Sequence, residues 1–353
     1  MKIDSYLELA VENEASDLFF IVDAHIQIKI EGQLSSLGTS LLTPEMTEAI
    51  ARHLMTKQQW ATFQEKRELD FAYSLPETRS RFRVNAYFQR GMVSLVLRYI
   101  KSKPPSLDEM ELPQILKDMI LRKRGLILMT GSTGSGKSTT LAAMLEYRNE
   151  RFPGHIITIE DPIEFIYEHK KSIFSQRELG LDTHSFADAL RSSLREAPDV
   201  VLIGEMRDRD TMEAALTLSN TGQLAISTLH SNNAHQAIQR IINLFPADQH
   251  KRLLLDLSIN LVAIVSQRLV MGVNGRRLAA VEIMVNTPYI RELIMLGKID
   301  EIKAAMEHTT AKNIQSFDRA LIQLFKEGKI TLDEALDNAD SAGDLEARIN
   351  FTE

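Results

Sequence analysis

The sequence predicts an α/β protein with more than one domain. Between about residues 113 and 285, short apolar runs alternate with helical stretches, which is the pattern of a doubly wound, mainly parallel sheet. A glycine-rich segment, residues 131–138, lies between one of these runs and the helical stretch that follows it. The length of 353 residues exceeds that of a typical single core, so two domains are expected.

Residues 1–100 are predicted to form a small α/β module. Four runs have the apolar content or the period-two alternation of strands: 19–22, 26–30, 81–87 and 93–99. Thr43 and Pro44 predict the start of a helix, because threonine is a good N-cap and proline suits the first helical position. The module is followed by the predicted linker, residues 101–112, whose first half holds two prolines and small polar residues that extend neither a strand nor a helix.

Residues 113–285 are predicted to form the core of the second domain. Its apolar runs predict four buried strands: 125–130, 155–159, 200–203 and 224–228. In a parallel sheet the carboxyl ends of the strands lie at one edge, so the segments after these strands are expected to carry the ligand-binding groups.

Residues 286–353 are predicted to be helical. Apolar side chains recur at helical spacing: Ile314, Phe317, Leu321, Leu324 and Phe325. Gly328 is expected to end this helix, and Thr331 with Glu334 predicts a capping box that starts the next one. We interpret these stripes as packing surfaces.

The segment 131–138 is a complete phosphate-binding loop in the expected context of strand, loop and helix. Its glycines let backbone N–H groups surround a triphosphate, Lys137 reaches the outer phosphates, and Ser138 can bind Mg²⁺. The predicted nucleotide-binding residues are Gly131, Ser132, Thr133, Gly134, Ser135, Gly136, Lys137, Ser138 and Thr139.

Acidic residues follow two of the predicted strands. Glu160, Asp161 and Glu164 come after 155–159 and are able to orient water or Mg²⁺, although a solvated acidic turn is the alternative. Glu205 follows 200–203, where a P-loop nucleoside triphosphatase places the carboxylate that assists Mg²⁺, usually through water.

A histidine and several arginines complete the candidate residues. His230 follows 224–228 and is either a sensor of the γ-phosphate or a structural hydrogen-bonding group. Phosphoryl transfer commonly uses an arginine to neutralise charge on the equatorial oxygens, and the first domain offers Arg81, Arg83 and Arg98. Spacing alone does not choose among these arginines.

Composition narrows the function classes. The chain has no cysteine, which excludes disulfides, thiolate nucleophiles and cysteine-ligated zinc, and its net charge of −7 argues against a broad nucleic-acid footprint. No apolar run approaches 18 residues, since the longest, 261–273, is interrupted by Arg268. The acidic N-terminal segment is unlike a signal peptide, so a cytoplasmic location is expected.

Taken together, the motifs resemble those of the secretion ATPases, and within them the PilT/PilU family of type IV pilus retraction ATPases. Segment 131–138 matches the family's Walker A motif, 157–165 its Asp box, 198–208 its Walker B motif and 221–230 its His box, in the family's order and spacing. The resemblance implies a PAS-like N-terminal domain, a RecA-like ATPase domain with a helical C-terminal region, and a homo-hexameric ring. It also implies that ATP and Mg²⁺ bind between the two domains.

Residue roles carried over by position follow from this resemblance. Lys137 and Ser138 would bind phosphate and Mg²⁺, and Glu205 would be the Walker B acid. Glu164 would polarise the attacking water. His230 would be the His-box histidine, and the site would be completed by the N-terminal arginines Arg83 and Arg98.

The chain departs from the family pattern at two places. Gln223 stands where the His box often has its first histidine, and a glutamine cannot titrate. The retraction motif appears as residues 289–296, with Met295 and Leu296 in place of an arginine and a glutamate. With these two residues the motif resembles that of the accessory PilU branch. This resemblance implies that the protein acts beside a PilT-type ATPase and an inner-membrane pilus platform protein. It also implies a location at the cytoplasmic face of the inner membrane.

Three other functions stay open at this point. A pilus-assembly or type II secretion ATPase generally has extra N-terminal domains and often a four-cysteine zinc module, and this sequence has no cysteine. A RecA-like nucleic-acid motor would need a basic, aromatic-rich strand-binding segment, and no nucleic acid is expected as a partner. A nucleotide-binding adaptor without turnover is suggested by Gln223 alone.

Overall fold

The computed structural model describes residues 3–30, 32–78, 80–100, 103–309, 311 and 313–350. Lys101 and Ser102 of the predicted linker, and residues 351–353 of the predicted C-terminal region, lie outside the described residues. The chain divides into two compact units. One contains the residues up to Lys103 together with Glu164–Ile166, and the other contains Pro104–Ile163 together with the chain from Tyr167 onward.

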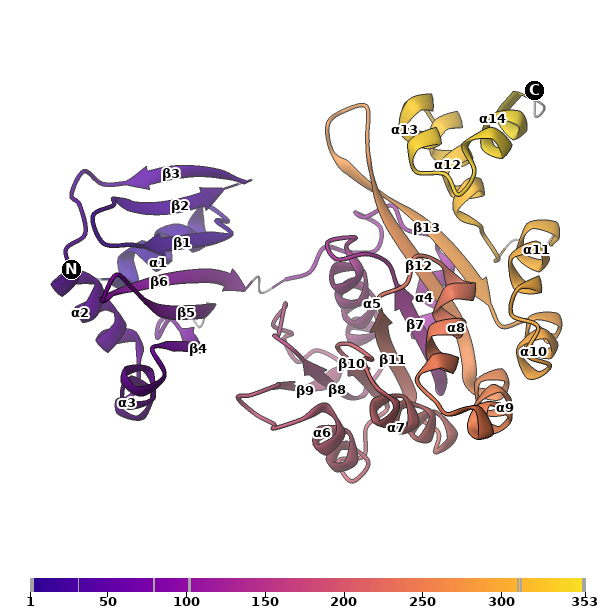
Figure 1. The fold of residues 1–353 in the computed structure, drawn as a ribbon, viewed down its shortest axis with the longest axis horizontal. Coiled ribbons are helices and arrows are strands. Elements are labelled where there is room, and N and C mark those ends of the chain that lie inside the picture. The colour runs from indigo at the N-terminus through magenta and orange to yellow at the C-terminus, as the bar shows by residue number, and fades with distance from the viewer. Residues whose placement is uncertain are drawn as a thin grey trace. The chain divides into compact units, whose positions relative to one another are not determined.

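The N-terminal unit is built on a six-stranded sheet with the order β3-β2-β1-β6-β5-β4, in which the neighbouring strands pair antiparallel (Figure 1). The strands are β1 (Asp17–Phe20), β2 (Ile26–Ile30), β3 (Gln33–Leu37), β4 (Glu68–Ser74), β5 (Arg81–Gln89) and β6 (Met92–Ile100), and the helices are α1 (Ile3–Glu12), α2 (Pro44–Leu54) and α3 (Lys57–Lys66). Phe20, Phe63 and Phe82 are completely buried in the core that joins the sheet to the helices. As predicted, Thr43 caps α2, accepting a hydrogen bond from the Met46 N–H.

The C-terminal unit contains a seven-stranded sheet with the order β13-β12-β7-β11-β10-β8-β9. The strands are β7 (Gly125–Thr130), β8 (Gly154–Glu160), β9 (Ser172–Glu178), β10 (Val200–Ile203), β11 (Leu224–Leu229), β12 (Leu261–Met271) and β13 (Arg277–Val285). Strands β7 to β12 pair in parallel, and β13 alone pairs antiparallel, as the second arm of a hairpin with β12. The four predicted core strands are present within one residue of their expected ends.

Helices surround this sheet and extend the unit toward its C-terminus (Figure 1). They are α4 (Ile115–Ile120), α5 (Lys137–Arg151), α6 (Phe186–Ser193), α7 (Arg209–Asn220), α8 (Ala234–Asn243), α9 (His250–Asn260), α10 (Pro288–Met295), α11 (Glu301–His308), α12 (Phe317–Lys326), α13 (Leu332–Asp337) and α14 (Ala342–Asn350), with a 3₁₀ turn at Ala247–Gln249. Side chains from α6 to α11 share one apolar core with the strands, whereas α12, α13 and α14 pack on β12 and β13 around Phe317 and Leu321. None of the helices within the described ranges is long and apolar enough to cross a bilayer.

The predicted capping box before α13 forms only in part. The Thr331 hydroxyl accepts a hydrogen bond from the Glu334 N–H, as expected. The Glu334 carboxylate instead accepts from the Met271 N–H at 2.8 Å, because the end of β12 presents a backbone donor to it. The glutamate therefore ties the C-terminal helices to the sheet.

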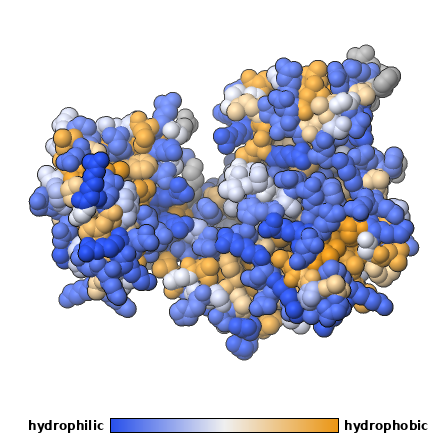
Figure 2. Space-filling view, in the orientation of Figure 1, coloured by the Kyte–Doolittle hydropathy of each residue, from blue (hydrophilic) through white to orange (hydrophobic). Residues whose placement is uncertain are grey.

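Exposed apolar side chains gather around α9 and α10. Figure 2 shows an apolar patch over the region of α8, α9 and α10. Leu255, Ile259, Met295 and Leu296 are all exposed there. The two residues that depart from the family's retraction motif, Met295 and Leu296, thus lie at the molecular surface, at the end of α10.

Candidate nucleotide site

The phosphate-binding loop leaves β7 and enters α5 in a conformation that requires glycine. Gly131 has a φ of 146°, and a Cβ at this position would lie 2.4 Å from the Gln267 carbonyl oxygen. Gly136 has a φ of 86°, and a Cβ here would lie 2.8 Å from the Gln267 side-chain nitrogen. Glycine is needed at both positions, because other residues avoid such φ values and have no room for a side chain here.

Gln267 holds this loop from the neighbouring strand β12. Its Nε2 donates to the Ser135 carbonyl oxygen at 2.9 Å, and its Oε1 accepts from the Thr140 hydroxyl at 2.8 Å. The side chain is 1% exposed, so both hydrogen bonds are shielded from water. Sequence reasoning missed this residue; the available signal was a lone glutamine within the apolar run 261–273.

Lys137 is folded back onto the loop itself. Its ammonium donates to the carbonyl oxygens of Gly131 and Ser132, both at 2.8 Å. Burial lowers the pKa of Lys137, and the charge of the Glu205 carboxylate opposes that shift. An ammonium held by two carbonyl oxygens is able to exchange them for phosphate oxygens, which carry more negative charge.

Hydroxyl groups around the loop fit a phosphate ligand. The side-chain oxygens of Thr130, Ser135 and Ser231 are buried, and within the described part of the chain they have no hydrogen-bond partner. Buried donors are normally satisfied, and phosphate oxygens are acceptors that these hydroxyls can use. Ser138, at the start of α5, is exposed. Its hydroxyl and the Glu205 carboxylate are oxygen ligands of the kind that Mg²⁺ takes beside phosphates and water.

Glu205 lies beyond the end of β10 and is held by two neighbours. Its Oε1 lies 3.2 Å from the Nε2 atom of His230, and its Oε2 accepts from the Arg207 Nε at 2.7 Å. The ends of β10 and β11 are joined nearby, since the Thr228 hydroxyl donates to the Gly204 carbonyl oxygen at 2.6 Å. The structure therefore brings together the predicted acid and the predicted histidine. It also adds Arg207, to which the sequence assigned no role.

Gln223 lies at the opposite end of β11 from His230. It precedes Leu224, the first residue of the strand, and its Oε1 accepts from the Thr221 hydroxyl at 2.6 Å. His230 follows Leu229, the last residue of that strand, which pairs with Thr130 just before the phosphate loop. The replacement of the family's first His-box histidine therefore lies away from the edge that carries Glu205 and His230.

The acidic residues at the end of β8 and in the turn after it differ in their surroundings. Glu160 is buried, and its Oε1 accepts from the Thr158 hydroxyl at 2.6 Å. Glu164 is exposed and falls in the segment Glu164–Ile166, which is grouped with the N-terminal unit. Its role as the residue that polarises water stays a prediction.

Arg83 and Arg98 stand directly opposite each other on β5 and β6. The Arg98 Nε lies 2.9 Å from Asp17, a buried carboxylate, and an Arg83 guanidinium nitrogen lies 3.8 Å from Asp70. The predicted site residues are thus divided between the two units, and the part of these arginines in nucleotide chemistry stays a prediction.

Comparison with known proteins identifies the family. A model of the type II/IV secretion system proteins matches residues 1–337. The chain belongs to this family. Among its relatives within the secretion family, the type IV pilus ATPase PilU of Pseudomonas aeruginosa is 47% identical over 352 residues, covering 99% of this chain and 92% of that protein. The pilus retraction ATPase PilT of the same organism is 39% identical over 339 residues, covering 96% and 98%.

A solved structure agrees with this family assignment. A crystal structure of the pilus retraction motor PilT with bound ADP superimposes with a TM-score of 0.91 at 40% identity, and the match covers 98% of this chain and 99% of that one. The predicted resemblance to the PilT/PilU branch of the secretion family and the α/β fold class with an N-terminal domain and an ATPase core are confirmed.

Proposed function

We propose that this chain is the ATPase of a type IV pilus retraction motor and hydrolyses ATP with Mg²⁺ at the edge formed by the phosphate loop, Glu205 and His230. The observation that carries the proposal is the Glu205–His230 contact at 3.2 Å, beside a phosphate loop whose Lys137 ammonium donates to two carbonyl oxygens that phosphate oxygens can replace. The relatives that match nearly the whole chain, PilU and PilT, are both pilus ATPases by name.

Each residue has a defined part in this proposal. Lys137 leaves the carbonyl oxygens of Gly131 and Ser132 to bind the outer phosphates, while Ser138 and Glu205 would hold a Mg²⁺ ion. When bound, Mg²⁺ neutralises charge that develops on the phosphates. Glu164 orients the attacking water, and Arg83 with Arg98 offsets charge on the transferred group. His230 responds to the γ-phosphate through its contact with Glu205.

The partners are proposed from the same family. We infer a homo-hexamer that acts with a PilT-type ATPase and an inner-membrane pilus platform protein, at the cytoplasmic face of that membrane. The apolar residues Met295 and Leu296, exposed at the end of α10, support the assignment to the accessory PilU branch.

Steady-state ATPase assays test the chemistry. Lys137→Ala is expected to abolish nucleotide binding and turnover, whereas Glu164→Gln is expected to bind ATP and fail to hydrolyse it. Lys171→Ala removes an exposed lysine of the same unit and serves as the matched control, with unchanged turnover. Normal turnover in Glu164→Gln would remove that residue from the mechanism.

Pilus retraction tests the biological role. Deleting the gene should reduce retraction in cells that still contain a PilT-type enzyme, and the Lys137→Ala variant should fail to restore it. Retraction that is intact at every load in the deletion strain would contradict the motor assignment.

A further inference from the structure

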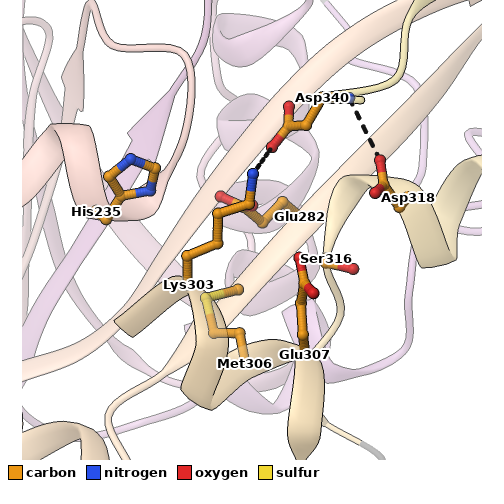
Figure 3. A pocket seen from close by; sticks show the side chains of 8 residues that line it. All are labelled: His235, Glu282, Lys303, Met306, Glu307, Ser316, Asp318 and Asp340. Carbon is orange, nitrogen blue, oxygen red and sulfur yellow. Dashed lines mark hydrogen bonds and ion pairs between the residues drawn. The ribbon is translucent and has the colours of Figure 1, made fainter. Parts of the chain in front are cut away.

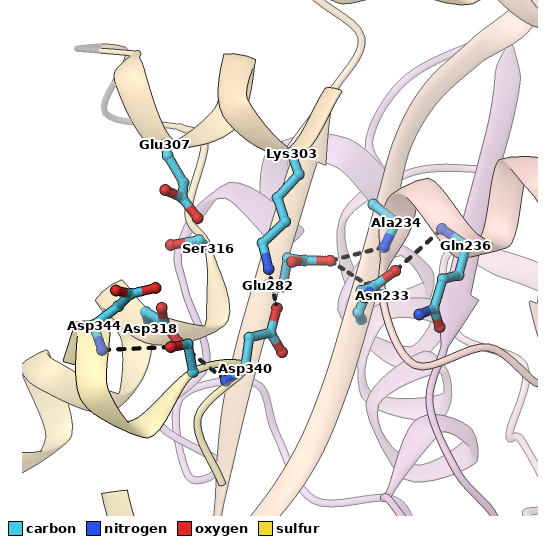
Figure 4. Close-up of polar contacts among 12 residues, drawn as sticks. Asn233, Ala234, Gln236, Glu282, Lys303, Glu307, Ser316, Asp318, Asp340 and Asp344 are labelled. Carbon is cyan, nitrogen blue, oxygen red and sulfur yellow. Dashed lines mark hydrogen bonds and ion pairs between the residues drawn. The ribbon is translucent and has the colours of Figure 1, made fainter. Parts of the chain in front are cut away.

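Glu282 is a buried carboxylate on β13 that contacts the first residue of α8. The residue is 6% exposed. Its Oε1 accepts a hydrogen bond from the Ala234 N–H at 2.8 Å (Figure 4). The same oxygen accepts from the Ser266 hydroxyl at 3.0 Å. The Ala234 N–H is one of the donors at a helix N-terminus that have no partner within the helix, and the helix dipole favours a negative charge at this place.

The same helix start limits where His230 can lie. Only three residues separate His230 from Ala234, and the last of them, Asn233, is the buried N-cap of α8, accepting from the Gln236 N–H at 3.1 Å. On the other side, Leu229 is held in β11 by its pairing with Thr130. The connection that carries His230 is therefore fixed at both ends, once by the sheet and once by the contact between Glu282 and α8.

We propose that Glu282 is a positioning residue, which holds the start of α8 and thereby keeps His230 in contact with Glu205 during ATP hydrolysis. The inference rests on the proposed role of His230 and assigns a function to a residue that lies outside the nucleotide-binding motifs. Within the described ranges the hydrogen bonds of Glu282 go to α8 and β12 and not to the phosphate loop, so its effect is expected on turnover rather than on ATP binding.

The surroundings of Glu282 make this contact sensitive to pH. Burial raises the pKa of Glu282 to about 7, while the Ala234 and Ser266 hydrogen bonds oppose that shift. Figure 3 shows Lys303 between the carboxylates of Glu282 and Asp340. Asp340 forms ion pairs with Lys303, at 3.1 Å, and with Arg268, at 2.8 Å. These two cations are therefore paired with the carboxylate of Asp340.

A small cavity of about 10 Å³ lies beside Glu282. Charged and titratable groups from every element around this cavity face Glu282. They are His235 on α8, Arg268 on β12, Lys303 and Glu307 on α11, Asp318 on α12, and Asp340 in the connection before α14. An ionised Glu282 forms the stronger, charge-assisted hydrogen bond to the helix start. Protonation near neutral pH therefore weakens the contact that positions the His230 connection.

The test measures kcat and KM of the full-length chain across neutral pH. In the native protein kcat is expected to rise as Glu282 ionises, and in Glu282→Gln this pH-dependent rise should be lost. Because a small displacement of a positioned group lowers turnover steeply, we expect kcat to fall about tenfold, with KM for ATP little changed. The matched control is Glu334→Gln, which removes a carboxylate that also accepts a backbone N–H in the same unit, from Met271.

His230→Ala and the double variant separate the possible failures. If His230→Ala leaves kcat unchanged, the proposed role of His230 fails, and the positioning inference falls with it. If His230→Ala lowers kcat but Glu282→Gln keeps the native kcat and pH profile, only the positioning inference is overturned. If both residues act together, the double variant should lose no more than the stronger single variant.

Hydrogen exchange on the native protein provides a measurement that does not depend on folded variants. The Ala234 amide should be better protected above neutral pH than below it, after correction for the intrinsic exchange rate. Equal protection on both sides of neutral pH would overturn the proposal.

Discussion

The His230 Nε2 atom lies 3.2 Å from the Oε1 atom of Glu205, although the two residues follow different strands. β10 and β11 pair in parallel, so the segments that leave their carboxyl ends meet at one edge of the sheet. Glu205 also accepts a hydrogen bond from Arg207 at 2.7 Å. One carboxylate therefore connects the end of β10 to the His box.

Removing the charge of Glu205 should separate nucleotide binding from hydrolysis. Glu205→Gln keeps the size of the side chain but weakens its interaction with Mg²⁺, so we expect ATP to bind while turnover falls about 100-fold or more. Fluorescent-nucleotide titration and steady-state turnover measure the two effects. Glu213→Gln, which alters an exposed acid of α7, is the control. Native turnover in Glu205→Gln would show that the Walker B role belongs to another residue.

Gln267 should determine how well the phosphate loop is ordered. Gln267→Ala leaves the Thr140 hydroxyl and the Ser135 carbonyl oxygen buried without their partner, which costs about 1–3 kcal/mol of unfolding free energy. We also expect KM for ATP to rise, because the loop loses its contact with β12. Denaturant unfolding and ATPase kinetics test this pair of effects. Gln239→Ala, which breaks an exposed hydrogen bond to Asp300, should change neither the unfolding free energy nor KM for ATP. If both variants behave alike, Gln267 does not hold the phosphate loop in place.

The two N-terminal arginines should respond differently to truncation. Arg98→Ala leaves Asp17, a buried carboxylate, without its ion pair at 2.9 Å, so the unfolding free energy should fall by about 1–3 kcal/mol. Arg83→Ala breaks a longer and more exposed pair with Asp70, for which about 0–1 kcal/mol is expected.

Arg83→Ala is therefore the cleaner test of an arginine in catalysis, because a loss of turnover would come without a loss of stability. Arg90→Ala, in the turn between β5 and β6, is the matched control. Turnover that matches the control would exclude Arg83 from the site.

Glu282 should make stability decrease as pH rises from about 4.5 to about 7. Its pKa is raised from 4.5 to about 7, so between these pH values the folded state keeps a proton that the unfolded state has released. The contribution of this group to stability is complete below about pH 4.5 and is lost as pH rises to about 7, a change of about 3 kcal/mol. Urea unfolding at several pH values measures it, and Glu282→Gln should show a smaller decrease than Glu334→Gln. An identical slope in both variants would show that Glu282 ionises normally.

The phosphate loop and the acids after the parallel strands could be predicted from the sequence, because their signals are local. The run 125–130 is β7 with the same ends, and 200–203 is β10. Strand polarity then predicts that Glu205 and His230 come to one edge, and the structure places them in contact. The predicted capping of α2 by Thr43 is local in the same way.

The residues that support the site could not be predicted in this way. Gln267 lies 132 positions after Ser135 in the chain, and Glu282 lies 48 positions after Ala234. Neither belongs to a motif, and a polar residue in an apolar run gives no sign of the backbone group it will meet.

The sequence by itself determined that a phosphate-binding loop lies at the carboxyl edge of a parallel sheet, because glycine conformation, strand pattern and helix start are properties of neighbouring residues. Only the tertiary structure decided which buried polar groups hold that edge in place. The hairpin of β12 and β13 packs beside β7 through pairing between distant segments, and it is this pairing that brings Gln267 to the phosphate loop and Glu282 to the start of α8.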